Sequence, residues 1–223
     1  VAEQQGLLRR ITQAVDVSWE PACLAKWAFQ ALPDKDRFGL LFDNVKGSDL
    51  TLCTGALGAS RQAYALALDV EPEQINAQWE NALVNPLKPV TVENAPCQEV
   101  VLKGDDAKLS DLPIPTWTPG KDAAPYITTT VMTRLVDSDN QNSGVYRTLV
   151  RDDHSVVVNM NPRRGGHDQC ETWWKQGKSA PVAWVIGADP AYQLASVATL
   201  PTGVQEMEIA GGLKGSPIEL VKC

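Results

Sequence analysis

A segment rich in proline and aspartate, GDDAKLSDLPIPTWTPG at residues 104–120, divides the sequence into two stretches of different character. It contains three prolines and three aspartates and shows no periodic apolar pattern, so neither a helix nor a strand is expected to run through it. A domain boundary is the simplest interpretation of such a segment. We therefore predict an N-terminal domain over residues 1–105 and a second domain over residues 106–223.

The first stretch alternates helical and strand patterns. Apolar spacing and start signals predict helices at four places: residues 7–15, residues 24–31, after Ser60 and from Glu71. The apolar runs at 38–45 and 49–55 are typical of buried strands. Together these patterns predict a small mixed α/β domain.

The second stretch is rich in strand patterns. Three β-branched runs separated by polar turns predict strands: YITTTVMTRLVD, GVYRTLVRDD and SVVVNMNP. The later patterns are a helix HDQCETWWKQG, a strand PVAWVIG, a helix DPAYQLASVATL and a terminal strand IELVKC. The fold class expected for the whole chain is therefore α+β.

Composition excludes several classes of function. The formal charge of -7 argues against a nucleic-acid-binding protein, which carries a basic face, and two histidines are too few for a histidine-based metal site. No apolar run approaches the roughly 20 residues of a membrane-spanning helix, so no span is expected. Five scattered cysteines without a CxxC pair are typical of reduced thiols, which predicts a cytoplasmic protein.

One arginine has an unusual predicted environment. If QNSGVYRTLV forms a continuous strand, Val145, Arg147 and Leu149 share one face of it. A guanidinium on an apolar face is costly to desolvate and needs an anionic partner. A phosphate, a substrate carboxylate and a structural glutamate all remain open as that partner.

A second basic motif, Arg163-Arg164-Gly165-Gly166, precedes the predicted two-tryptophan helix. Bidentate guanidinium groups, a close backbone approach at glycine and a helix N-terminus all suit a phosphate group. Surface arginines beside a glycine turn are an equally open interpretation.

Several motifs in one order and spacing resemble those of the UbiD family of decarboxylases, which use prenylated FMN. The matching stretches are DLPIPTWTPGKDAAPYIT, QNSGVYR, RRGG, PVAWVIGADPA, LPTGVQE and IELVKC, with a weaker match at LGASRQAYAL. The resemblance implies that a split β-barrel similar to that of flavin reductases follows the mixed N-terminal domain and holds the flavin. It also implies (de)carboxylation of an aromatic or α,β-unsaturated carboxylic acid, and a homo-oligomeric full-length protein.

The same resemblance implies roles for individual residues. Asn142 and Glu206 match the family's ligands to a divalent metal, with Mn²⁺ expected first and Mg²⁺ second, and K⁺ is a further expected ion. Arg147 matches the catalytic arginine of a Glu–Arg–Glu network. The positions that match cofactor contacts are Val145, Tyr146, Arg147, Asn159, Met160, Asn161, Arg164, Gly165, Ser196 and Val197.

The sequence departs from the family pattern in two ways. Arg163 stands where many members have a metal-binding histidine, and an arginine does not ligate metals. The two glutamates of the network and the family's C-terminal domain are expected beyond Cys223, so residues 1–223 are expected to be a piece of a longer protein and inactive alone. A flavin-binding module or auxiliary subunit without decarboxylase activity, and an FMN-dependent reductase, are the rival interpretations.

Overall fold

The computed structural model describes residues 1–200 and 203–223. The chain packs as two compact units, each discontinuous in sequence. Unit 1 comprises Val1–Ile75, Leu102–Ile127 and Thr148–Val157, and unit 2 comprises Asn76–Val101, Thr128–Arg147 and Val158–Cys223. The boundary between residues 105 and 106 stays a prediction, because these units describe packing rather than the extent of a family's domains.

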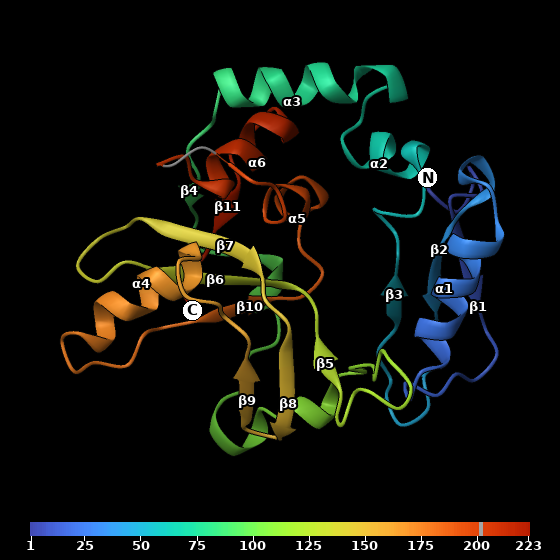
Figure 1. The fold of residues 1–223 in the computed structure, drawn as a ribbon, viewed down its shortest axis with the longest axis horizontal. Coiled ribbons are helices and arrows are strands. Elements are labelled where there is room, and N and C mark those ends of the chain that lie inside the picture. Colours follow the sequence, from blue (N-terminus) through green and yellow to red (C-terminus); the bar gives the residue numbers. More distant parts are fainter. Residues whose placement is uncertain (201–202) are drawn as a thin grey trace. The chain divides into compact units, whose positions relative to one another are not determined.

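Unit 1 is built on a small mixed sheet covered by a helix (Figure 1). Its elements are β1 (Leu8–Ile11), α1 (Glu20–Ala31), β2 (Gly39–Phe42), β3 (Leu52–Thr54), α2 (Arg61–Ala67), β5 (Tyr126–Ile127), β8 (Thr148–Asp152) and β9 (Ser155–Val158), of which Val158 falls in unit 2. β2 pairs in parallel with β1 and antiparallel with β3, while β5, β8 and β9 form a second sheet. Phe42, fully buried, lies in a core with Ala28 of α1.

Unit 2 contains most of the helices and the sheet β10-β6-β7. Its elements are α3 (Ile75–Val84, whose first residue falls in unit 1), β4 (Val90–Thr91), β6 (Thr130–Arg134), β7 (Gln141–Val145), α4 (Gly165–Trp174), β10 (Ala183–Val185), α5 (Pro190–Ala195), α6 (Glu206–Lys214) and β11 (Glu219–Leu220). β6 pairs antiparallel with both β7 and β10, so β7 is an edge strand. α4 lies against β6 and β7, and α5 and α6 pack side by side (Figure 1).

The structure confirms the mixed α/β character expected from the sequence. None of the sheets in the described part of the chain closes on itself, so the split barrel stays a proposal. No helix in residues 1–200 or 203–223 combines the length and apolar character needed to cross a membrane.

The helix predicted over residues 7–15 is wrong. Leu8 and Ile11 belong to β1, which is parallel to β2, and the two arginines between them are exposed. Arg10 forms ion pairs with Glu3 at 2.8 Å and Asp43 at 2.7 Å. Apolar residues three positions apart are compatible with one face of a helix and with the two ends of a short strand. Pairing with the buried strand β2 favours the strand here.

The continuous strand predicted through Val145, Arg147 and Leu149 is also wrong. β7 ends at Val145 and β8 begins at Thr148, so the alternation of faces is interrupted at Tyr146 and Arg147. Arg147 is exposed, whereas the sequence placed it on an apolar face. The desolvation argument for an anionic partner of Arg147 therefore does not hold in this structure.

Candidate functional site

Every residue that the sequence singles out for cofactor or metal binding lies in unit 2. They occupy β7 and the two residues after it, the segment after β9, the start of α4, the end of α5 and the first residue of α6. Unit 2 thus gathers segments from residues 142 to 206 of the sequence. Pro201 and Thr202 of the LPTGVQE motif lie outside the described residues.

The outer edge of β7 is closed by two side chains from the start of α6. The backbone N–H of Gln141 donates to Oε1 of Gln205 at 3.2 Å, and the N–H of Ser143 donates to Oε2 of Glu206 at 3.1 Å. Backbone donors of an edge strand need partners, and these side chains supply them. As a result Glu206 lies directly beside the strand that carries Asn142.

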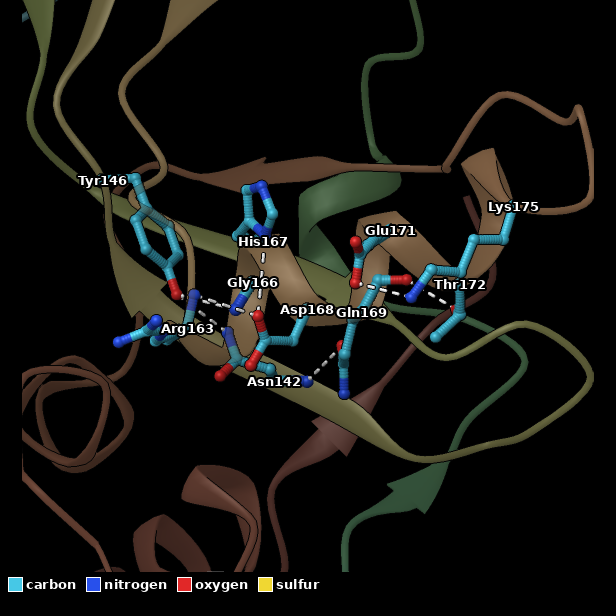
Figure 2. A network of polar contacts seen from close by, with 10 residues as sticks. All are labelled: Asn142, Tyr146, Arg163, Gly166, His167, Asp168, Gln169, Glu171, Thr172 and Lys175. Carbon is cyan, nitrogen blue, oxygen red and sulfur yellow. Dashed lines mark hydrogen bonds and ion pairs between the residues drawn. The ribbon is translucent and has the colours of Figure 1, made fainter.

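Asn142 lies within a small polar network at the start of α4 (Figure 2). Its amide can take two orientations, which differ by a half-turn of the amide group. In one, Oδ1 accepts hydrogen bonds from the N–H of Gly166, the hydroxyl of Tyr146 and the N–H of Ser143, each at 3.2 Å. In the other, drawn in Figure 2, Nδ2 donates to the Tyr146 hydroxyl at 3.2 Å, which turns Oδ1 away from these donors.

The glycines at the start of α4 are required by these side chains. A Cβ at Gly165 would collide with Oδ1 of Asn142, and a Cβ at Gly166 would lie 2.8 Å from Cζ of Tyr146. The hydroxyl of Tyr146 also accepts from the N–H of Gly166 at 3.0 Å. Glycine therefore lets Asn142 and Tyr146 reach the helix N-terminus, where the helix dipole favours negative charge.

The arginines at this end of unit 2 are exposed. Arg163 has a φ of 66°, and its backbone N–H donates to Oδ1 of Asp168 at 3.1 Å. Arg164 is the N-cap residue of α4 and makes no side-chain capping hydrogen bond. The backbone oxygen of Arg147 accepts from the N–H of Asn159 at 3.0 Å, which places these two predicted site residues next to each other.

Glu206 is a partly buried carboxyl group whose pKa is raised. Burial is the main cause, and hydrogen bonds from backbone N–H groups, including that of Ser143, partly oppose it. No ion pair to Glu206 is found within the described residues. A desolvated carboxylate without a cation is a position that a bound divalent ion would stabilise.

The residues around Glu206 hold it through Ser143. The hydroxyl of Tyr192 donates to Oγ of Ser143 at 2.8 Å, and both side chains are buried. Burial is the main cause that raises the pKa of Tyr192 to about 12, so its hydroxyl stays a neutral donor. Among residues 1–200 and 203–223 no group of three or more His, Cys, Asp or Glu is arranged so that it could hold a metal ion. A divalent ion here would depend on Asn142, Glu206 and oxygens of a ligand or water.

Ser196 and Val197 differ in exposure. Ser196 is buried, and its Oγ lies 2.9 Å from Oγ1 of Thr130 and donates to the backbone oxygen of Gln193 at 2.8 Å. Val197 is 62% exposed. The roles proposed for Met160 and Asn161 likewise stay predictions.

Sequence reasoning missed Gln169, which joins the network from the buried face of α4. Its Oε1 accepts from Oγ1 of Thr133 at 2.9 Å and from the N–H of Asn142 at 3.1 Å. A detectable signal existed, because Gln169 stands beside Cys170 on the face of the helix that also buries Gly166. A lone glutamine on an apolar helix face needs buried hydrogen-bond partners.

Two family models match the chain. The 3-octaprenyl-4-hydroxybenzoate carboxy-lyase N-terminal domain matches residues 1–83, and the Rift-related domain of the same carboxy-lyase matches residues 88–223. Both models describe the UbiD family.

Solved structures of UbiD-class enzymes are similar over the whole chain. HmfF from Pelotomaculum thermopropionicum in complex with FMN is 33% identical with a TM-score of 0.87, and the match covers 100% of this chain and 48% of HmfF. An evolved dimeric form of HmfF in complex with prFMN is 35% identical with a TM-score of 0.88, covering 100% and 50%. The apo 3,4-dihydroxybenzoic acid decarboxylase from Enterobacter cloacae is 28% identical with a TM-score of 0.85, covering 99% and 48%.

The chain thus spans about half the length of these enzymes. The two family models together extend over nearly all of it, and the motifs that first indicated the resemblance lie within them. This chain belongs to the UbiD family.

Proposed function

We propose that this chain is the cofactor-binding portion of a prenylated-FMN-dependent (de)carboxylase that acts on aromatic or α,β-unsaturated carboxylic acids. The observation that carries the proposal is that Asn142 is the neighbour in β7 of Ser143, whose N–H binds Glu206, and that Asn142 lies against the N-terminus of α4 at Gly165. Relatives solved with FMN and with prFMN support the choice of cofactor. A split barrel, a homo-oligomeric longer protein and a cytoplasmic location belong to the same proposal.

The residues of unit 2 suit a flavin phosphate and a divalent ion. The start of α4 offers a positive helix end, and Arg163 and Arg164 add two exposed guanidinium groups there. Asn142, with Oδ1 turned away from Tyr146, and the carboxylate of Glu206 would hold Mn²⁺ or Mg²⁺. Arg163 stands in place of a histidine ligand, so the protein offers the ion two ligands and not three. The ion would therefore depend more on oxygens of the flavin phosphate and of water.

The remaining residues would contact the cofactor and substrate. When bound, the prenylated flavin supplies the electron sink that loss of CO₂ requires. In this proposal the exposed guanidinium of Arg147 binds and orients the substrate carboxylate. The cofactor contacts proposed are Val145, Tyr146, Asn159, Met160, Asn161, Arg164, Gly165, Ser196 and Val197.

Flavin binding tests the proposal. FMN fluorescence titrated with the wild-type chain should show saturable binding, and Arg164→Ala should weaken it roughly tenfold or more, because a charge-assisted contact contributes about 1.5–3 kcal/mol. Arg151→Ala, an exposed arginine of β8, is the matched control and should bind like wild type. Riboflavin, which lacks the phosphate, should bind wild type and Arg164→Ala equally weakly. Equal affinity of wild type and Arg164→Ala for FMN would remove Arg164 from the site.

We further propose that residues 1–223 bind the cofactor without releasing CO₂. The resemblance requires two glutamates around Arg147, and none of residues 1–223 matches them. Without that acid, the proton that replaces CO₂ has no positioned donor. Reconstitution with prenylated FMN under anaerobic conditions, with cinnamate or protocatechuate, should give no measurable CO₂. Turnover that Arg147→Ala abolishes would mean that carboxyl groups within the chain supply the proton.

A further inference from the structure

The two proposed metal ligands lie on different elements, so the site depends on how those elements are held together. Asn142 is on the edge strand β7, and Glu206 is the first residue of α6. A metal site loses affinity when its ligands move by a fraction of an ångström. One hydrogen bond joins the two elements directly beside the ligands: the N–H of Ser143 donates to Oε2 of Glu206 at 3.1 Å.

Ser143 is itself fixed by a third element. Its Oγ accepts from the Tyr192 hydroxyl of α5 at 2.8 Å, and Ser143 and Tyr192 are 3% and 4% exposed. A buried hydroxyl pair at this distance is stable, because breaking it leaves both groups without a partner. α5 is in turn joined to α6 by an ion pair between Asp189 and Lys214 at 2.9 Å.

Ser143 is therefore the point where three elements meet within unit 2. Its backbone belongs to β7, its N–H binds α6 and its side chain binds α5. Asn142, its neighbour in the chain, follows any movement of this residue. A shift of Ser143 would change the positions of both proposed ligands at once.

We propose that Tyr192 is a positioning residue for the metal site, acting through Ser143 on Asn142 and Glu206. The inference rests on the proposed function, since it concerns the same divalent ion. Tyr192 touches neither the ion nor the flavin in this account. Its hydroxyl restrains the serine to which Glu206 is bound, in the way that outer hydrogen bonds orient metal ligands in other proteins.

The test uses Tyr192→Phe, which removes the hydroxyl and keeps the ring that fills the core. With FMN present, Mn²⁺ affinity of the chain is measured from the EPR signal of free Mn²⁺. Tyr192→Phe and Ser143→Ala should each weaken Mn²⁺ binding by about fivefold to tenfold. The double variant should be no weaker than Ser143→Ala alone, because both changes break one connection.

Ala191→Gly is the matched control. Ala191 is a buried residue of α5, and glycine at this position weakens the helix while leaving the hydroxyls of Tyr192 and Ser143 in place. Thermal unfolding should show similar destabilisation in Ala191→Gly and Tyr192→Phe, while Mn²⁺ affinity in Ala191→Gly stays within about twofold of wild type. If Tyr192 acted only by stabilising α5, both variants would lose Mn²⁺ affinity equally.

Each outcome decides between the two proposals. Wild-type Mn²⁺ affinity in Tyr192→Phe, together with loss of binding in Glu206→Gln, would overturn the role of Tyr192 and keep the metal site. Equal weakening of Mn²⁺ binding in Ala191→Gly and Tyr192→Phe would also overturn the role of Tyr192, because general destabilisation of α5 would then explain both results. Absence of Mn²⁺ binding in the wild-type chain with FMN would overturn both the metal site and the positioning role.

Discussion

Two neighbouring glycines at the start of α4 determine how closely side chains approach the candidate site. A Cβ added at Gly166 would lie 2.8 Å from the hydroxyl oxygen of Tyr146. This oxygen accepts a hydrogen bond from the backbone N–H of Gly166. The ring cannot withdraw without breaking that hydrogen bond. The absence of a side chain at Gly166 is therefore as necessary to this site as its charged groups are.

Gly166→Ala is predicted to destabilise the chain by about 1–3 kcal/mol, because an added methyl group overpacks the contact with Tyr146. Urea unfolding measures this change. Gly58→Ala, where nothing lies within 4 Å of the added Cβ, is the control and should stay close to wild type. Equal stability of the two variants would show that the Tyr146 ring moves freely.

The raised pKa of Glu206 leads to a pH-dependent prediction. Because burial raises its folded-state pKa above the ordinary value of 4.5, stability from this group is present below that value and lost as pH rises through the folded pKa. In EDTA, the Tm of wild type should therefore fall relative to Glu206→Gln as pH increases from 4 to 7. Glu208→Gln, on the same helix, is the control. A Tm that falls in parallel in wild type and Glu206→Gln would contradict the burial of the Glu206 carboxylate.

At the level of elements, α5 depends on one residue that contributes in two ways. Oδ1 of Asp189 accepts from the N–H of Ala191 at 2.9 Å and caps the helix, while Oδ2 pairs with Lys214 of α6. Asp189→Asn keeps the cap and loses the ion pair, and should cost less than about 1 kcal/mol. Asp189→Ala loses both and should cost about 1 kcal/mol more in urea unfolding. Equal effects of the two substitutions would mean that the cap contributes nothing.

Elements with local signals could be predicted from the sequence. Ser60 caps α2 by accepting from the N–H of Ala63, Glu71 opens the next helical segment with a capping box, and Asp189 caps α5, at the places where the sequence predicts these helices to begin. Such signals act within a few residues, so the sequence contains the whole cause.

Elements that depend on packing could not be predicted. No helix is predicted from the sequence at α6, because Gly211 and Gly212 weaken helix propensity there. Added Cβ atoms there would lie 2.6 Å from the backbone oxygen of Leu87 and 2.9 Å from Cα of Ala82, so the glycines exist for close contact. The helix is stabilised by tertiary burial, which includes both glycines together with Met207, Ile209, Ala210 and Leu213.

The same distinction holds for the candidate site. The resemblance identified Asn142 and Glu206, but their connection through Ser143 and Tyr192 joins residues up to 63 positions apart. The helix face of Gln169 could be predicted, but its hydrogen bond from Asn142 could not, for the same reason. Side-chain hydrogen bonds between distant elements follow from the fold and not from motif spacing.

At the scale of the whole molecule, both family models match the chain, and the proposed site lies within one of its two units. Unit 2 contains all the proposed ligands. The relatives extend to about twice the length of this chain, and their full activity therefore stays a proposal here. Cofactor binding is the property that can be measured directly on residues 1–223.

The most direct test is the linkage between metal and flavin. FMN affinity is measured by fluorescence with EDTA and with saturating Mn²⁺, for wild type and Glu206→Gln. If one ion is shared by Asn142, Glu206 and the flavin phosphate, Mn²⁺ should tighten FMN binding to wild type by about tenfold, because the two ligands stabilise each other. Glu206→Gln should bind FMN with an affinity that Mn²⁺ does not change. Wild-type FMN affinity that is the same in EDTA and Mn²⁺ would contradict a shared metal site.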